Sequence, residues 1–194
     1  MTLKRTILPT AAAVAALAFA AVAATPTLAQ MKEQTVTVGG APMYPSKNII
    51  QNAVNSKDHT TLVAAVKAAG LVDTLQGAGP FTVFAPTNAA FAKLPKGTVE
   101  SLLRPQMKEN LVAVLTYHVV PSRLSAKDLM DSAKKSGGRA KLKTVEGEEL
   151  TVEAKANTLT IWDAKGSASK VTIQNVIQSN GVIHVVDSVL LPSS

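Results

Sequence analysis

The sequence predicts an α+β fold, with helices concentrated in its first half and strands in its second. Between residues 48 and 115, apolar side chains recur at the three- and four-residue spacing of amphipathic helices. From Ala140 onward they recur at every second position, which is typical of strands with one buried face. Helices followed by strands, in a chain long enough for one hydrophobic core, indicate the α+β class.

The first 29 residues have the three parts of a secretory signal peptide. A lysine and an arginine give a positive start, residues 7–24 are apolar and rich in alanine, and Thr27-Leu28-Ala29 places small residues where a signal peptidase reads them. We expect residues 1–29 to be removed, with cleavage after Ala23 or Ala24 as alternatives, and the mature protein to be periplasmic or secreted. The alternative is a retained membrane anchor, which an alanine-dominated run favours less.

The rest of the chain is modestly basic and has no cysteine. Its formal charge of +7 falls to +5 once Lys4 and Arg5 leave with the signal peptide. That charge fits a protein that meets anionic envelope or matrix polymers, and it fits equally a protein that is only soluble. Without disulfides, an exported domain depends on core packing for its stability. Residues 30–45 contain Gly39-Gly40 and two prolines, so we expect an N-terminal extension or linker there.

Helix signals follow in quick succession. Residues 48–54 predict a short helix, and residues 59–69 predict a longer one with Asp58 as its N-cap and Gly70 as its stop. Two further helices are expected between residues 98 and 115, because apolar side chains there share one side.

The stretch GPFTVFAPTNAAF at residues 79–91 predicts a buried strand that turns directly into a helix. Pro86 cannot donate a backbone hydrogen bond, so the strand ends there, and Thr87 is a good N-cap for the helix that follows. Three aromatic side chains of this stretch are expected to anchor the core, namely Phe81, Phe84 and Phe91.

Two later stretches carry equally clear signals. YHVVPSRLSAKDL at residues 117–129 predicts a short strand, and then a helix opened by a capping box of Ser125 with Asp128. SNGVIHVVDSVLLP at residues 179–192 contains Asn180-Gly181, a strong signal for a two-residue type I′ hairpin turn.

These three stretches, in this order, resemble the signature segments of the fasciclin (FAS1) domain family, and the resemblance runs over residues 46–192. The chain is similar to the bacterial, secreted, single-domain type. The resemblance implies a wedge of short β-strands with helices packed over it. It also implies a non-catalytic adhesion or interaction role toward polysaccharide or protein of the cell envelope or matrix. Because some fasciclin-like proteins resemble lipid- or carotenoid-binding modules, a carrier of a small apolar ligand is the alternative.

The residues themselves give no catalytic pattern. His59, His118 and His184 are too scattered to predict a metal site, and no cysteine is available. The sequence has no nucleophile elbow, phosphate loop or dinucleotide fingerprint. We therefore expect no enzyme activity, no metal and no cofactor. His184 lies in an apolar run and should make a buried hydrogen bond, whereas His59 should be exposed at a helix start.

Four residues are candidates for binding through the resemblance. Tyr117-His118 looks like the Tyr-His motif that animal members of the family use in adhesion. Asn175 and Val176 occupy the place of an Asp-Ile pair just before the hairpin, and the carboxylate of that pair is absent here. On the pattern alone, Tyr117 and His118 point to opposite faces of a strand, with core packing as the alternative to binding.

The densest positive run is a second candidate surface. It would attract an acidic polysaccharide or another polyanion, and the alternative is a solvated loop and strand face that only keeps the protein soluble. Aromatic residues make up 4% of the chain, so stacking platforms for bases are scarce and we expect no nucleic-acid partner. The residues of this run are Lys134, Lys135, Arg139, Lys141 and Lys143.

Overall fold

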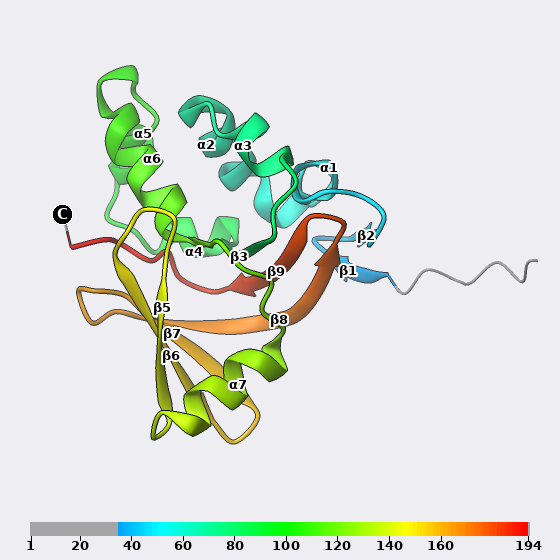
Figure 1. Ribbon diagram of the computed structural model, residues 1–194. Helices are drawn as coiled ribbons and strands as arrows, with labels where there is room; N and C mark the ends of the chain where they lie inside the picture. The colour runs from blue at the N-terminus through cyan, green and yellow to red at the C-terminus, as the bar shows by residue number, and fades with distance from the viewer. Residues whose placement is uncertain (1–34, 194) are drawn as a thin grey trace, which may run out of the picture. The chain divides into compact units, whose positions relative to one another are not determined.

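The computed structural model describes residues 35–193, so the expected signal peptide at 1–29 lies outside the described residues. The α+β prediction is confirmed, because helices fill the first half of this region and strands most of the second (Figure 1). No helix within residues 35–193 is long and apolar enough to cross a membrane. The helices are α1 (Ile49–Ala53), α2 (Thr60–Ala69), α3 (Val72–Gln76), α4 (Asn88–Ala92), α5 (Thr98–Leu102), α6 (Lys108–Tyr117) and α7 (Ala126–Lys135), with short 3-10 turns η1 (Lys57–His59) and η2 (Pro105–Met107). The strands are β1 (Val36–Val38), β2 (Ala41–Met43), β3 (Phe81–Pro86), β4 (Val119–Val120), β5 (Arg139–Lys143), β6 (Glu149–Lys155), β7 (Thr158–Trp162), β8 (Ala168–Gln178) and β9 (Gly181–Val186).

Seven of the strands form one sheet in the order β4-β3-β9-β8-β7-β6-β5. β3 and β9 pair in parallel, with Phe81 opposite Gly181, and the other neighbours are antiparallel. The two edge strands of the sheet, β4 and β5, come close to each other. The N–H of Val145, just after β5, donates to the carbonyl of Val119 in β4 at 2.8 Å. The sheet therefore curls into the wedge that the resemblance implied.

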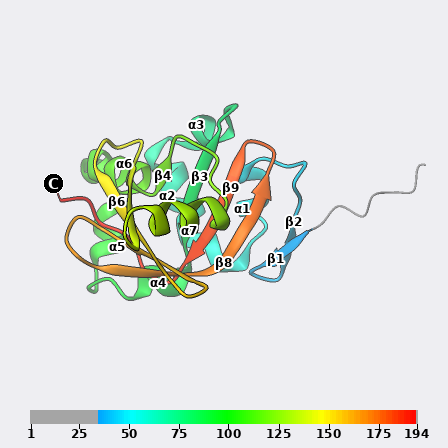
Figure 2. The same ribbon diagram turned by 60° about the horizontal axis from the view of Figure 1, so that its bottom comes forward.

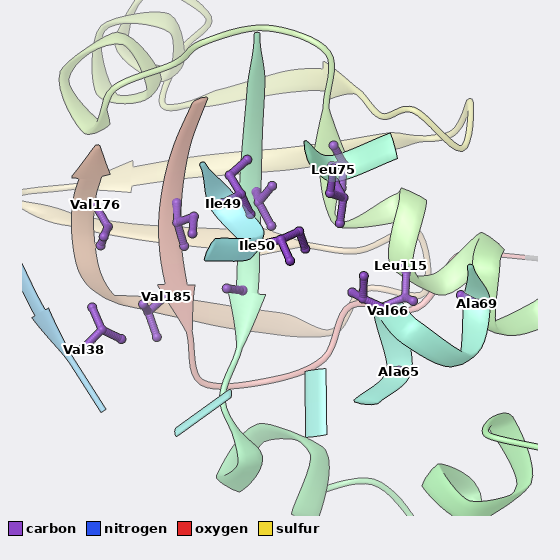
Figure 3. Close-up of a cluster of buried hydrophobic side chains, with 14 of the residues drawn as sticks. Val38, Ile49, Ile50, Ala65, Val66, Ala69, Leu75, Leu115, Val176 and Val185 are labelled. Carbon is purple, nitrogen blue, oxygen red and sulfur yellow. The ribbon is translucent and has the colours of Figure 1, made fainter. Parts of the chain in front are cut away.

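Successive residues of β3 belong to two hydrophobic clusters, one on each face of the strand. Val83 and Ala85 pack in the larger cluster with side chains of α1, α2, α3 and α6. Figure 3 shows this cluster, which Val176 of β8 and Val185 of β9 complete from the sheet. The other side chains labelled there are Val38, Ile49, Ile50, Ala65, Val66, Ala69, Leu75 and Leu115.

Helix α7 covers the opposite face, away from the other helices (Figures 1 and 2). Its Leu129 packs in the second cluster with Phe84, which has no exposed surface. Phe91 is also buried, so both predictions are confirmed, whereas Phe81 is only partly buried at the margin of the larger cluster. The inward-facing side chains of β6 and β7 that α7 covers are Leu150, Val152, Leu159 and Ile161.

Within the segment expected as an N-terminal extension or linker, residues 36–43 form two strands. β1 and β2 pair as an antiparallel hairpin, and their Val38 and Met43 side chains are buried in the larger cluster. Gly39 lies in the turn with φ 58°, and a Cβ there would be 2.4 Å from Ser56 Oγ. The small residues that suggested a linker therefore permit a close contact between the hairpin and η1.

The N-cap residue was predicted correctly for two helices and wrongly for a third. Thr87 caps α4 and Ser125 opens α7 with a capping box, as predicted. Asp58 does not cap α2, because it lies within η1. The side-chain oxygen of Asn88, on α4, instead accepts a hydrogen bond from the N–H of Thr61 in the first turn of α2 at 2.9 Å.

The β8–β9 hairpin is present, but its turn is not type I′. Gln178 pairs with Gly181, so Ser179 and Asn180 form the turn, and neither Asn180 nor Gly181 has a positive φ. The Asn180 side chain is used for long-range bonds instead: Oδ1 accepts from the N–H of Ile49, and Nδ2 donates to the carbonyls of Leu75 and Gly77. Asn180 thus ties the hairpin to the helical layer.

Candidate functional site

Tyr117 and His118 are not on a strand, and this prediction was wrong. Tyr117 is the last residue of α6, and His118 follows it as the C-cap. Both side chains are buried, at 0% and 3% exposure, so neither is available to a partner. The Tyr117 hydroxyl donates to the carbonyl of Glu149 and accepts from the N–H of Ala164. Burial raises the pKa of Tyr117 to about 12, so the phenol stays neutral.

His118 joins helix α6 to the C-terminal segment. Its Nδ1 is 2.7 Å from the carbonyl of Val114, and its Nε2 accepts from the N–H of Leu190 at 3.0 Å. These two bonds require the neutral ring with its proton on Nδ1. Burial lowers the pKa of His118 to about 4, which keeps that form at neutral pH. The role of this histidine in the fold is therefore structural.

Asn175 and Val176 point in different directions from an irregular stretch of β8. Pairing with β9 shifts register between Ile173 and Val176, so Asn175 lies in a bulge. Asn175 is exposed and has φ 56°, a left-handed conformation that asparagine tolerates better than most residues. Val176 is 1% exposed and belongs to the core. Of the four binding candidates, Asn175 alone is accessible.

Hydrogen bonds to α7 and β9 fix the position of Asn175. Its Oδ1 accepts from the N–H of Ala126, the first residue of α7, at 2.7 Å. Its own N–H donates to Nδ1 of His184, whose Nε2 is 3.0 Å from the carbonyl of Leu124. The predicted buried hydrogen bond of His184 is confirmed, and burial lowers the pKa of this histidine. The bulge, β9 and the start of α7 are thus held as one unit.

A groove of about 490 Å³ lies beside Asn175. The N-terminal hairpin forms one wall and β8 forms the other, so the groove exists because the expected linker is folded. Nδ2 of Asn175 makes no hydrogen bond to any of the residues 35–193. The residues that line the groove are Thr35, Val36, Met43, Pro45, Asn175 and Ile177.

The five residues of the positive run are exposed and close together in the chain. Lys134 and Lys135 end α7, and the other three point outward along β5. Arg139 pairs with Glu153 at 3.3 Å and Lys141 with Glu149 at 2.8 Å, both carboxylates being on β6. Sequence reasoning missed Trp162, whose ring lies under the Arg139 guanidinium. Its alternation with Thr158 and Thr160 on β7 was the available signal.

His59 is buried, at 4% exposure, and the prediction that it is exposed was wrong. η1 turns the ring inward, where Nδ1 is 2.9 Å from Ser56 Oγ, and burial lowers the pKa of the ring. His59 lines an apolar cavity of about 30 Å³. A neighbouring apolar cavity of about 40 Å³ lies between α1, α2, α3 and β3. Within residues 35–193, no three histidine or acidic side chains are grouped to hold a metal ion.

The fold and these segments agree with one family. The sequence model of the fasciclin domain matches residues 57–192, and the chain belongs to the fasciclin domain family.

Several known proteins are similar to this chain. Protein sll1483 of Synechocystis is 44% identical over 162 residues, which cover 82% of each protein. Immunogenic protein MPB70 of Mycobacterium bovis is 33% identical, and the match covers 99% of each protein. A solved FAS1 domain pair from the insect cell adhesion molecule Fasciclin I matches with a TM-score of 0.68 at 20% identity, over 82% of this chain and 58% of that one. This last likeness is one of fold.

Proposed function

We propose that this protein is an exported, non-catalytic interaction domain that binds polysaccharide or protein of the cell envelope or matrix through the groove beside Asn175. Membership of the fasciclin domain family and the fold shared with an insect cell adhesion molecule support a role in adhesion. The observation that carries the proposal is Asn175 itself. An exposed residue held in a sparsely populated backbone conformation by two other elements is typical of a functional position.

The groove offers recognition by shape and hydrogen bonding. Its lining combines the apolar side chains of Val36, Met43 and Ile177 with the amide of Asn175 and the hydroxyl of Thr35. None of its lining residues is a titratable acid, base or nucleophilic thiol, so the lining supplies no group for general acid–base catalysis. A binding role therefore fits this chemistry better than an enzymatic one.

The carrier alternative depends on the apolar cavities, and their small size supports it less than it supports the interaction role. They measure about 40 and 30 Å³. An engineered cavity that admits benzene has about 150 Å³. A lipid or carotenoid would require α1 and α2 to move away from β3, which would expose the larger hydrophobic cluster. Bound pigment or lipid in the protein purified from its native source would reverse this preference.

Binding of the mature protein to envelope and matrix fractions, measured by co-sedimentation, tests the proposal. Asn175→Gly removes the amide but keeps a residue that accepts φ 56°, so it should abolish most of the binding. Ala156→Gly is the matched control, because Ala156 is the other non-glycine residue of the described region with a positive φ, at 53°. It lies in the β6–β7 turn and should bind normally. Unchanged binding by Asn175→Gly would refute the proposed groove.

Export is tested separately, by mass spectrometry of the extracytoplasmic protein. We expect an N-terminus near Gln30. An intact Met1 there would refute cleavage.

A further inference from the structure

Strands β5, β6 and β7 have one face under α7 and one face toward solvent. The inner face is apolar, and its Leu150 and Ile161 have no exposed surface. Side chains at alternate positions point the other way. We call the surface made by these outward side chains and Lys170 of β8 the outer face. They are Arg139, Lys141, Lys143, Glu149, Thr151, Glu153, Lys155, Thr158, Thr160, Trp162 and Lys170.

Arg139 is held in a fixed orientation on the outer face. Its Nε and Nη2 donate to Oε1 of Glu153 at 3.4 and 3.3 Å, and its guanidinium carbon is 5.2 Å from the centre of the Trp162 ring. Nε1 of Trp162 donates to the other oxygen of Glu153 at 2.8 Å, and this bond lowers the pKa of Glu153. Because 58% of the Arg139 side chain remains exposed, its remaining donors are available to a carboxylate or sulfate group.

Two further cations, Lys155 and Lys170, lie on the same face of the sheet as this guanidinium. Lys170 lies in the same cross-strand row, since Arg139 is opposite Glu153, Glu153 opposite Thr160, and Thr160 opposite Lys170. Four strands at their usual spacing make this row about 14 Å wide. Lys155 is two residues beyond Glu153 on β6, and neither Lys155 nor Lys170 is in an ion pair among residues 35–193.

The carboxylates near the outer face do not cancel its charge evenly. Glu149 and Glu153 are already paired with Lys141 and Arg139. Asp187, whose Oδ1 accepts from the N–H of Lys170, is paired with Lys93. Two more carboxylates lie in the turn that joins β5 to β6, at the Lys143 end. The opposite end is therefore the more positive. It contains Arg139, Lys155 and Lys170, with Lys134 and Lys135 just before it in the chain.

We propose that the Arg139 end of the outer face binds an acidic polysaccharide, with carboxylate or sulfate groups, across the strands. This inference rests on the proposed interaction function and names one partner class for a surface separate from the Asn175 groove. Arg139 and Lys170 lie at the two ends of this row of four residues, and cations so far apart suit a linear polyanion better than a compact anion. Nucleic acid fits less well, because Trp162 is the only aromatic side chain of the outer face and Arg139 already covers its ring.

Equilibrium binding of the mature protein to alginate and to dextran sulfate, at low salt, tests this proposal. Replacing Lys135, Lys155 and Lys170 together by glutamine should weaken binding to both polymers about tenfold. The matched control replaces Lys67, Lys96 and Lys108, three exposed lysines of the helical layer, and should change affinity less than about twofold. Arg139→Lys keeps the charge but loses the planar donor pair, and should also weaken binding.

Several results would overturn the proposal. They are equal losses in the two triple variants, no binding to either polymer, equal binding to uncharged dextran, or tighter binding to single-stranded DNA than to alginate. The groove is tested by a different variant in a different assay, Asn175→Gly in co-sedimentation with envelope and matrix fractions. Failure of the groove hypothesis and failure of this one are therefore distinguishable.

Discussion

Nε2 of His118 accepts a hydrogen bond from the N–H of Leu190, which lies 72 residues further along the chain. Through this bond the end of helix α6 holds the segment that follows β9. The bond needs an unprotonated Nε2, and protonation of the buried ring would also place a charge in the core. The stability of the domain is therefore coupled to pH through this one contact.

We predict that the free energy of unfolding falls between pH 6.5 and pH 4. The pKa of His118 is lowered from 6.5 to about 4 in the folded state, so in this range the unfolded chain binds a proton that the folded chain does not. The stabilisation is fully present above pH 6.5, and about 3 kcal/mol of it is lost by pH 4. The pKa values of His59 and His184 are also lowered, so their effect has the same sign.

Urea unfolding at pH 7, 5 and 4 measures this loss, and NMR titration of the His118 ring identifies its source. A folded-state pKa of 6 or above for His118 would contradict the prediction.

Phe84→Ala should destabilise the domain by about 3–5 kcal/mol. Phe84 has no exposed surface, lies in the second cluster and stacks on His184 with ring centres 5.9 Å apart. Val145→Ala is the control, because Val145 is 43% exposed and its truncation should cost less than about 0.5 kcal/mol. Thermal and urea unfolding compare the two variants. Similar stabilities would mean that Phe84 does not anchor the core.

Gly181→Ala should damage the fold far more than Gly166→Ala. A Cβ on Gly181 would be 2.2 Å from the carbonyl oxygen of Phe81, so β3 and β9 would have to separate, at a cost of about 3 kcal/mol or more. Gly166 has φ 82° in open space, so alanine there adds only backbone strain of about 1 kcal/mol. Equal losses in urea unfolding would show that this close contact is unimportant.

Asn175→Ala should lower the free energy of unfolding by about 2 kcal/mol. Alanine loses the hydrogen bond to the N–H of Ala126 and is strained at φ 56°. Asn175→Asp keeps the acceptor and should be nearly neutral, and Asn175→Gly should cost about 1 kcal/mol. This order, measured by urea unfolding, separates the structural contribution of Asn175 from binding. An Asn175→Ala variant as stable as the parent would contradict the geometry.

The fold could be read from the sequence where the signals are local. The strand that ends at Pro86, the cap at Thr87 and the capping box at Ser125 each depend on residues within a few positions of one another. They form as predicted because packing agrees with local preference.

The candidate site was harder to predict because its geometry depends on distant residues. The pattern around Tyr117-His118 predicts a strand, but α6 continues through Tyr117. Both rings are buried in the protein interior. The exposure of Asn175 follows from a bulge and from a helix that begins 49 residues earlier in the chain. The contact between Arg139 and Trp162 requires the register of three strands, which no single segment specifies.

The parallel pairing of β3 with β9 has a consequence for how the domain forms. β9 is synthesised after every other described strand, yet it lies between β3 and β8 in the sheet. Until β9 arrives, β3 has only β4 beside it, and both hydrophobic clusters lack one wall. A contact across so long a stretch of chain forms slowly. The sheet and both clusters can therefore be completed only after nearly all of the chain has been made.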